Sequence, residues 1–151
     1  YVDYDIDDFK YSDNPFYIKI GDNYFSKDNI HIDINDTCNG IVMYGDIEYS
    51  NSINICNTLI SPSIMGPFSY MPFMECNHGV LSMKCNVNGM IYINDREYVF
   101  DDGFGYIEKD YGCSFPKSYI WCQGNSFSKR DASFMISIAD IPFMLFNCGW
   151  M

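Results

Sequence analysis

The chain contains many short segments in which apolar and polar residues alternate, and no apolar stretch keeps helical spacing over three turns. The expected strands cover residues 16–20, 30–34, 41–49, 79–87, 90–93, 97–100, 118–124 and 132–139. The turn signals between them include Gly21-Asp22-Asn23, Asn39-Gly40, Asn88-Gly89 and Asn94-Asp95-Arg96. Short strands joined by tight turns, without intervening helices, predict an all-β antiparallel barrel or sandwich.

The composition limits the classes of ligand that such a fold could bind. The 151 residues suffice for one domain with a real core, and aromatic residues make up 18% of them. A barrel with a large interior would place these rings around a hydrophobic small molecule. The net charge of −11 repels phosphate backbones, so we expect no nucleic-acid partner.

The cysteines and the apolar runs bear on localisation. The seven cysteines form no CxxC pair, and no signal-peptide pattern is visible, which together favour a reducing cytoplasm. No apolar run approaches the roughly 20 residues that a membrane-spanning helix needs. We therefore expect a cytoplasmic protein, and peripheral contact with a membrane stays open.

Standard cofactor and metal signatures are absent from the sequence. There is no phosphate-binding loop, no nucleophile elbow and no dinucleotide-binding glycine pattern. Cys76 and His78 could ligate a metal ion, but two ligands do not make a zinc site. We expect neither a cofactor nor a metal.

Two features suggest what lies around the expected sheet. Residues 59–79 hold three prolines and three methionines without clean alternation, which predicts a long ordered crossing loop, either functional or simply a lid that fills a barrel end. The chain begins at Tyr1 and stops at Met151 just after an apolar run. We therefore expect it to be a segment of a longer protein, whose remainder would be a partner.

The segment 105–125 concentrates charged, aromatic and amide side chains. If residues 105–112 form a strand, then Tyr106, Glu108 and Asp110 share one face. Two carboxylates side by side in an apolar cavity favour retention of a proton on one of them, which suits a proton donor near neutral pH. The alternative is that Glu108, Lys109 and Asp110 form a structural cluster of ion pairs and hydrogen bonds at a barrel rim, which holds the turn at Phe115-Pro116.

Two further groups of residues could take part in such a site. Tyr119, Trp121, Gln123 and Asn125 would share a face of the next strand, which is an unusual core face and a plausible lining for a phenolic head group. Glu75 and His78 lie three positions apart, and they could form either a structural pair or an acid–base couple.

Three segments of the chain resemble the tocopherol cyclase family, in its bacterial branch. They are SPSIMGPFSYMPFMECNHGVLSM (61–83), GFGYIEKDYGCSFPKSYIWCQGNSF (103–127) and, more weakly, ASFMISIADIPFM (132–144). The resemblance implies two lipocalin-like β-barrel halves, of which residues 1–151 would be the first half and the start of the second. The sequence departs from the family pattern at Tyr111, where Trp is usual, and at Cys113 and Gly124.

The resemblance also implies a chemistry. Plant members close the chromanol ring of tocopherols from a prenylated hydroquinone, without a redox cofactor, at a lipid surface. Related barrels of the carotenoid hydratase type protonate an isoprenoid double bond. The hypothesis is therefore acid-catalysed cyclisation of a prenylated hydroquinone or a similar isoprenoid. The alternatives are a non-catalytic lipocalin-like carrier and a structural domain with a filled barrel.

Each candidate residue has a role in that hypothesis. Asp110 or Glu108 would donate the proton, and the other carboxylate or His78, which Glu75 could assist, would accept the phenolic proton. The expected substrate-binding residues are Tyr106, Tyr111, Tyr119, Trp121, Gln123 and Asn125. Among these, Tyr111, Tyr119 and Trp121 would stabilise the cation. Gln123 and Asn125 would orient the hydroxyl groups of the substrate.

Overall fold

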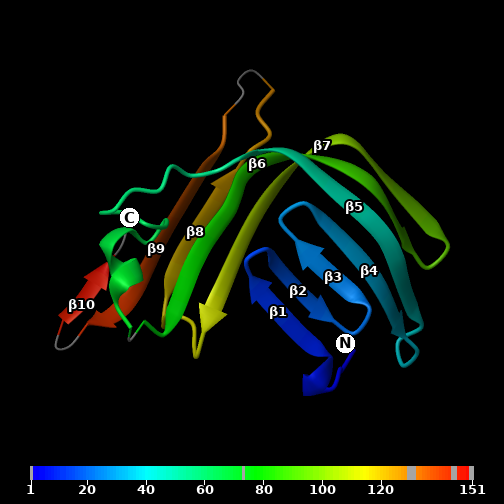
Figure 1. Cartoon of the computed structure of the whole chain (residues 1–151), viewed down its shortest axis with the longest axis horizontal. Helices are drawn as coiled ribbons and strands as arrows, with labels where there is room; N and C mark the ends of the chain where they lie inside the picture. Colours follow the sequence, from blue (N-terminus) through cyan, green and yellow to red (C-terminus); the bar gives the residue numbers. More distant parts are fainter. Residues whose placement is uncertain (1, 73, 129–131, 144–145, 150–151) are drawn as a thin grey trace. The chain divides into compact units, whose positions relative to one another are not determined.

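The structure is a computed structural model, and it describes residues 2–72, 74–128, 132–143 and 146–149 (Figure 1). The described residues form β-strands and two short 3-10 helices, η1 (Ile6–Asp8) and η2 (Gly66–Tyr70). The strands are β1 (Phe9–Asp13), β2 (Phe16–Ile20), β3 (Asn23–Ser26), β4 (Asn29–Asp36), β5 (Ile41–Ile53), β6 (Cys76–Ile93), β7 (Arg96–Gly112), β8 (Tyr119–Gly124), β9 (Phe134–Phe143) and β10 (Phe146–Gly149).

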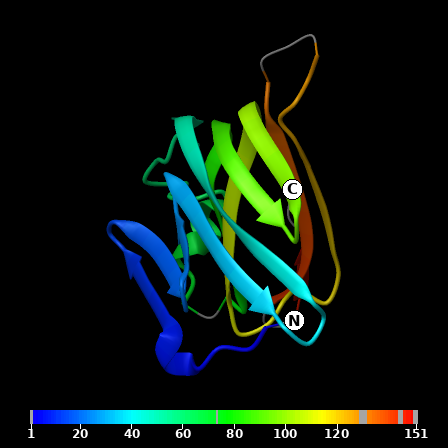
Figure 2. The same ribbon diagram turned by 90° about the vertical axis from the view of Figure 1, so that its right-hand side faces the viewer.

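The strands pair in two antiparallel sheets, so the predicted all-β antiparallel fold is confirmed. The first sheet has the order β1-β2-β3-β4-β5-β6-β7 and the second has the order β10-β9-β8. Strands β1 to β5 follow one another as successive hairpins (Figures 1 and 2). Among the described residues, no helix is long and apolar enough to cross a membrane.

The chain divides into two compact units, each assembled from two segments. Unit 1 comprises Tyr1–Ser52 and Cys85–Gly105, and unit 2 comprises Ile53–Lys84 and Tyr106–Met151. The long strands β6 and β7 therefore contribute residues to both units.

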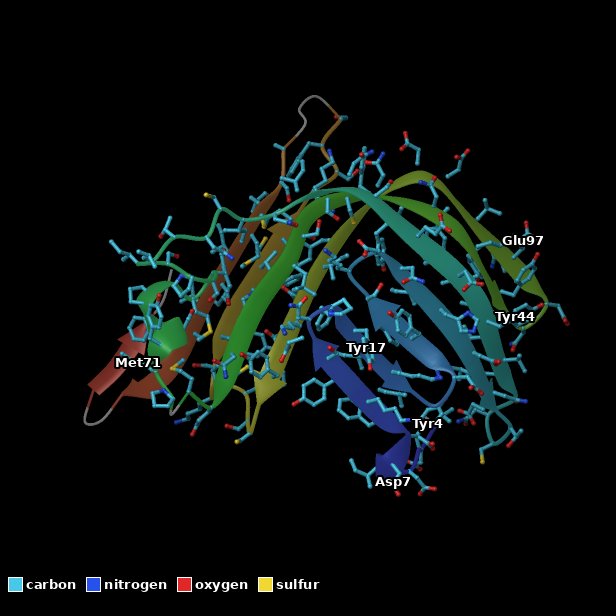
Figure 3. All side chains as sticks on the ribbon, viewed as in Figure 1. Tyr4, Asp7, Tyr17, Tyr44, Met71 and Glu97 are labelled. Atoms are coloured by element: carbon cyan, nitrogen blue, oxygen red, sulfur yellow. The ribbon has the colours of Figure 1, made fainter. Side chains whose placement is uncertain are left out.

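Unit 1 has a small core and many ordered surface rings. Ile47, Cys85 and Val87 are buried. Tyr44 stacks on Tyr92 with ring centroids 5.0 Å apart, and the Tyr92 hydroxyl donates a hydrogen bond to Glu97 (Figure 3). Aromatic pairs across strands stabilise a sheet in this way. Part of the aromatic excess in the sequence is thus used on the sheet surface of unit 1.

The predicted turn at Asn88-Gly89 is wrong, because β6 runs without a break from Cys76 to Ile93. Gly89 has φ +139°, and a Cβ atom there would lie 2.2 Å from the Asp46 carbonyl oxygen of β5. Gly45 makes the reciprocal approach to Met90. Glycine is needed here because the two backbones come too close for a side chain, and not because the chain reverses.

The structure confirms the other predicted turns and the predicted crossing loop, with small changes in their bounds. Turns lie at Gly21-Asp22, Asn39-Gly40 and Asn94-Asp95, as predicted. Residues 54–75, where described, contain η2 but no strand, so the long crossing loop exists and ends at β6, earlier than residue 79. This loop belongs to unit 2, together with the β8-β9-β10 sheet.

Candidate active site

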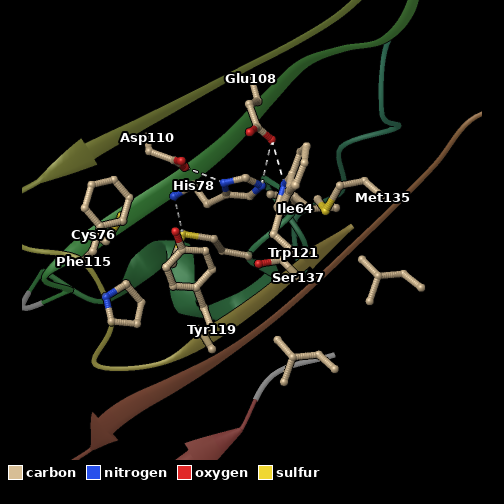
Figure 4. A pocket seen from close by; sticks show the side chains of 15 residues that line it. Ile64, Cys76, His78, Glu108, Asp110, Phe115, Tyr119, Trp121, Met135 and Ser137 are labelled. Carbon is tan, nitrogen blue, oxygen red and sulfur yellow. Dashed lines mark hydrogen bonds and ion pairs between the residues drawn. The ribbon is translucent and has the colours of Figure 1, made fainter. Parts of the chain in front are cut away.

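Unit 2 contains a partly open cavity of about 780 Å³, within the range typical of small-molecule sites. Its wall is largely apolar and aromatic. The crossing loop supplies Ile64 and Met65, and the segment before β8 supplies Phe115 and Pro116. Strand β8 supplies Tyr119 and Trp121, and strand β9 supplies residues 135–139. The remaining lining residues, Cys76, His78, Glu108 and Asp110, come from β6 and β7 (Figure 4). A few ionisable groups therefore face an apolar space.

His78 connects the two carboxylates of this cavity. Its Nδ1 atom lies 2.5 Å from Asp110 Oδ1, and its Nε2 atom lies 3.7 Å from Glu108 Oε2 (Figure 4). Glu108 and Asp110 are two residues apart in β7 and share a face, while His78 comes from the neighbouring strand β6. The side chain of His78 is 18% exposed. The imidazole thus hydrogen-bonds Asp110 through Nδ1, whereas Nε2 is buried within ion-pair distance of Glu108 and has no hydrogen-bond partner among the described residues.

Glu108 is also an acceptor for two ring systems. Its Oε2 atom accepts a hydrogen bond from the Tyr106 hydroxyl at 2.7 Å and from Trp121 Nε1 at 3.3 Å. Burial raises the pKa of Tyr106 well above its ordinary value, and the hydrogen bond and charge of Glu108 add to that shift. Tyr106 therefore stays a protonated phenol that donates to Glu108.

Cys76 and the backbone of His78 add two further polar groups to this part of unit 2. Burial, and then the charge of Asp110, raise the pKa of Cys76, so its thiol stays protonated. The His78 backbone N–H donates to Met65 Sδ at 3.1 Å. Within the described ranges, no three His, Cys, Asp or Glu side chains are grouped as a metal site would require.

The structure brings together most of the residues singled out from the sequence. His78, Glu108, Asp110, Tyr119 and Trp121 all line the cavity. Tyr106 lies next to them, with its ring centroid 6.3 Å from that of Trp121. These residues therefore form a cluster of hydrogen bonds and ring contacts at the wall of the cavity.

Glu75 and Tyr111 lie outside this group. Glu75 Oε2 accepts a hydrogen bond from Ser114 Oγ at 3.1 Å, and the Glu75 backbone oxygen accepts from Cys113 N at 2.8 Å. The ring of Tyr111, which is 59% exposed, lies 5.3 Å from Lys109 Nζ. Neither residue is part of the cavity lining.

Gln123 and Asn125 are not part of the cavity lining either. Gln123 shares the strand face of Trp121, and its Nε2 atom is buried without a hydrogen-bond partner among the described residues. Asn125 follows the last residue of β8, Gly124, so strand alternation no longer fixes its direction.

Sequence reasoning missed the contribution of β9. In the β8–β9 register Trp121 faces Ser137, and Tyr119 faces Ala139. Alternation within 132–139 was visible in the sequence, but the register that sets Ser137 opposite Trp121 was not. Ile64 and Met65 had no periodic signal at all, because they lie in the loop.

A comparison with protein-family models confirms the resemblance seen in the sequence. Residues 29–140 match the family described as tocopherol cyclase-like, and this range contains all the cavity-lining residues. No curated protein and no solved structure matches the chain significantly. Because the family match covers about three quarters of the 151 residues, the chain belongs to the tocopherol cyclase-like family.

Proposed function

We propose that the cavity of unit 2 binds a prenylated hydroquinone, or a similar isoprenoid phenol, and cyclises it by acid catalysis. The observation that carries the proposal is the position of His78 between Asp110 and Glu108 in an otherwise apolar cavity. Membership of the tocopherol cyclase-like family supports the same class of chemistry. The reaction is an isomerisation, so it needs no oxidant or reductant.

Asp110 is assigned as the proton donor. Its Oδ1 atom is engaged by His78 Nδ1, so Oδ2 is the oxygen assigned to the substrate. The hydrogen bond from the imidazole stabilises the carboxylate that remains when the proton leaves. Transfer of that proton to the trisubstituted double bond forms a C–H bond and leaves a tertiary carbocation.

Glu108 is assigned as the acceptor of the phenolic proton. The phenol oxygen attacks the cation, the C–O bond of the new ring forms, and the oxygen loses its proton to Glu108. His78 contacts both carboxylates, and it returns this proton to Asp110. The site therefore ends each cycle with the number of protons with which it began.

The aromatic wall stabilises the cation between these two steps. Trp121 and Tyr119 line the cavity on β8, and a well-placed ring stabilises a cation by about 0.5 to 2 kcal/mol. The hydrogen bond from Trp121 Nε1 to Glu108 fixes the indole next to the acceptor. Water would capture the cation, so an apolar wall also protects the product.

The test is turnover of a prenylated hydroquinone by the full-length protein that contains this chain, followed by chromatographic detection of the cyclised product. We expect Asp110→Asn to lower the turnover number by about 100-fold to 10,000-fold, the usual loss when a general acid is removed. Asp101→Asn, on the same strand but outside the cavity, is the matched control. Unchanged turnover in Asp110→Asn would remove the proposed acid.

A carrier without catalytic activity is the second candidate, because the cavity wall is mainly apolar. It predicts that the prenylated hydroquinone binds and is recovered unchanged. Asp110→Asn would then leave the amount of bound ligand unaltered, and no protein variant would yield the ring-closed product.

A further inference from the structure

Ser137 places one small hydroxyl group on the apolar β9 wall of the cavity. Its neighbours in the lining are Met135, Ile136, Ile138 and Ala139, whose side chains are all apolar. Ser137 is half-buried, and no other residue that the structure describes forms a hydrogen bond with its hydroxyl. A serine hydroxyl can both donate and accept a hydrogen bond. This group is therefore available to a polar group of a ligand in an otherwise apolar part of the wall.

The position of Ser137 follows from its strand partner, Trp121. The two residues lie directly opposite each other in the β8–β9 pair, which puts their side chains on the same face. Figure 4 shows both side chains at the cavity. At the other end of the indole, Trp121 Nε1 donates a hydrogen bond to Glu108 Oε2 at 3.3 Å. The indole therefore lies between the carboxylate of Glu108 and the hydroxyl of Ser137.

An aromatic ring between two polar groups matches the shape of a hydroquinone. The ligand carries a hydroxyl group at each end of one ring, and offset stacking on the Trp121 indole is a favourable arrangement for that ring. The proposed reaction places the hydroxyl next to the prenyl chain at Glu108. The second hydroxyl then projects from the opposite edge of the ring, toward β9 and Ser137.

The second hydroxyl group has no other assigned partner in the cavity. The sequence led us to expect that Gln123 and Asn125 would orient the substrate hydroxyls, but neither residue is part of the lining. Ser137 carried no such signal in the sequence, because its place depends on the register between β8 and β9.

We propose that Ser137 is a specificity-determining residue that hydrogen-bonds the second hydroxyl group of the substrate, para to the oxygen that closes the ring. The cavity then prefers a prenylated hydroquinone to a prenylated phenol with a single hydroxyl group. Ser137 takes no part in proton transfer, so it is a positioning residue. This inference rests on the proposed function for the position of the first hydroxyl at Glu108.

The experiment measures the binding of two ligands to the full-length protein that contains this chain. One ligand is a short-chain prenylated hydroquinone, and the other is the matching phenol, which keeps the hydroxyl next to the prenyl chain and lacks the second one. Quenching of Trp121 fluorescence gives a dissociation constant for each ligand. We expect the wild type to bind the hydroquinone more tightly, and Ser137→Ala to lower this preference by about 2-fold to 12-fold, the contribution of one neutral hydrogen bond. The dissociation constant of the phenol should be equal in both proteins.

Further variants make the outcome specific. Ser137→Thr keeps a hydroxyl group and suits a strand, so it should keep the wild-type preference. Ser133→Ala is the matched control, because the Ser133 hydroxyl already donates to the Met83 carbonyl oxygen at 2.5 Å and lies outside the cavity lining. Equal preferences in Ser137→Ala and the wild type would overturn the proposal. Loss of the preference in Tyr119→Phe and not in Ser137→Ala would also overturn it, because Tyr119 would then be the residue that recognises the second hydroxyl.

The binding measurement separates this inference from the proposed function. A protein that binds both ligands but forms no cyclised product would contradict the proposed catalysis. A preference that depends on Ser137 would still support the hydroxyl contact in that case. Absence of quenching by either ligand would overturn both proposals.

Discussion

His78 Nδ1 and Asp110 Oδ1 lie 2.5 Å apart, although the two residues are 32 positions apart in the chain. The contact crosses from β6 to β7, which are neighbours in the first sheet. The proposed acid, Asp110, is thus hydrogen-bonded to one nitrogen of the imidazole. The other nitrogen of that imidazole lies near a second carboxylate, Glu108. The proposed acid, the imidazole and the proposed acceptor of the phenolic proton therefore form one connected group of side chains.

Removing His78 should reduce the rate and leave substrate binding almost unchanged. His78→Gln keeps a polar side chain but cannot carry a proton from Glu108 to Asp110, so we expect a fall in kcat of about 100-fold or more. KM should change by less than about threefold, since the apolar wall is intact. Steady-state kinetics with the prenylated hydroquinone measures both quantities.

The other histidine of the chain is the matched control for this experiment. His31 Nδ1 lies 2.7 Å from Asp46 Oδ1 in unit 1, and His31 is not part of the cavity lining. His31→Gln should keep wild-type kcat and KM. Equal losses in both variants would indicate a general effect on folding instead of proton transfer.

Trp121 should report directly on the cavity. An isoprenoid phenol bound against its indole should quench the fluorescence of Trp121, and Trp121→Leu should remove that part of the response. Because one ring contributes about 0.5 to 2 kcal/mol to cation stabilisation, turnover in Trp121→Leu should fall by about 2-fold to 30-fold. Quenching of equal size in Trp121→Leu and the wild type would place the ligand elsewhere.

The raised pKa of Tyr106 should appear in the alkaline stability of the protein. Burial and Glu108 raise the pKa of Tyr106 in the folded state above its unfolded value of about 10. The resulting stabilisation is complete below about pH 10 and is lost as the pH rises above that value. Denaturant titrations at pH 8 and pH 11 should show a smaller loss of stability in Tyr106→Phe than in the wild type.

The control for Tyr106 is a tyrosine on the surface. Tyr11 is 66% exposed, and Tyr11→Phe should lose as much stability between pH 8 and pH 11 as the wild type does. If Tyr106→Phe and Tyr11→Phe lost equal stability between pH 8 and pH 11, the raised pKa of Tyr106 in the folded state would be contradicted.

Gly89→Ala should destabilise the protein strongly, because a Cβ atom would lie 2.2 Å from the Asp46 backbone oxygen. We expect a loss of about 2 to 4 kcal/mol, as for other substitutions that force a backbone to shift. Gly40→Ala is the matched control, since it has φ +65° but nothing within 4 Å of the added Cβ atom. It should cost only about 1 to 2 kcal/mol, the penalty of the left-handed conformation. Thermal unfolding of both variants checks the order.

The sequence predicted those features that depend on strand alternation. Glu108 and Asp110 share a face because side chains alternate along β7, and the same rule separates Tyr111 from them. The family resemblance placed Tyr111 in the cation-stabilising wall, whereas the geometry places it beside Lys109.

The features that the sequence could not predict depend on pairing between distant strands. The contact of His78 with Asp110 requires that β6 and β7 be neighbours in the sheet. The local sequence of either strand does not predict this pairing. Asn88-Gly89 has the composition of a hairpin turn, but the approach of Asp46 from β5 gives Gly89 its actual role. Local composition cannot distinguish a glycine needed for a turn from one needed for a close crossing.

The two-segment construction of each unit has a practical consequence for dissecting the protein. The chain passes from one unit to the other at residues 52–53, 84–85 and 105–106. No single proteolytic cut or gene truncation can therefore yield the two units as separate fragments. A fragment beginning at Ile53 would hold all of unit 2 but would still carry Cys85–Gly105 between His78 and Glu108. Isolating unit 2 would require replacing that insert with a short hairpin that joins β6 directly to β7.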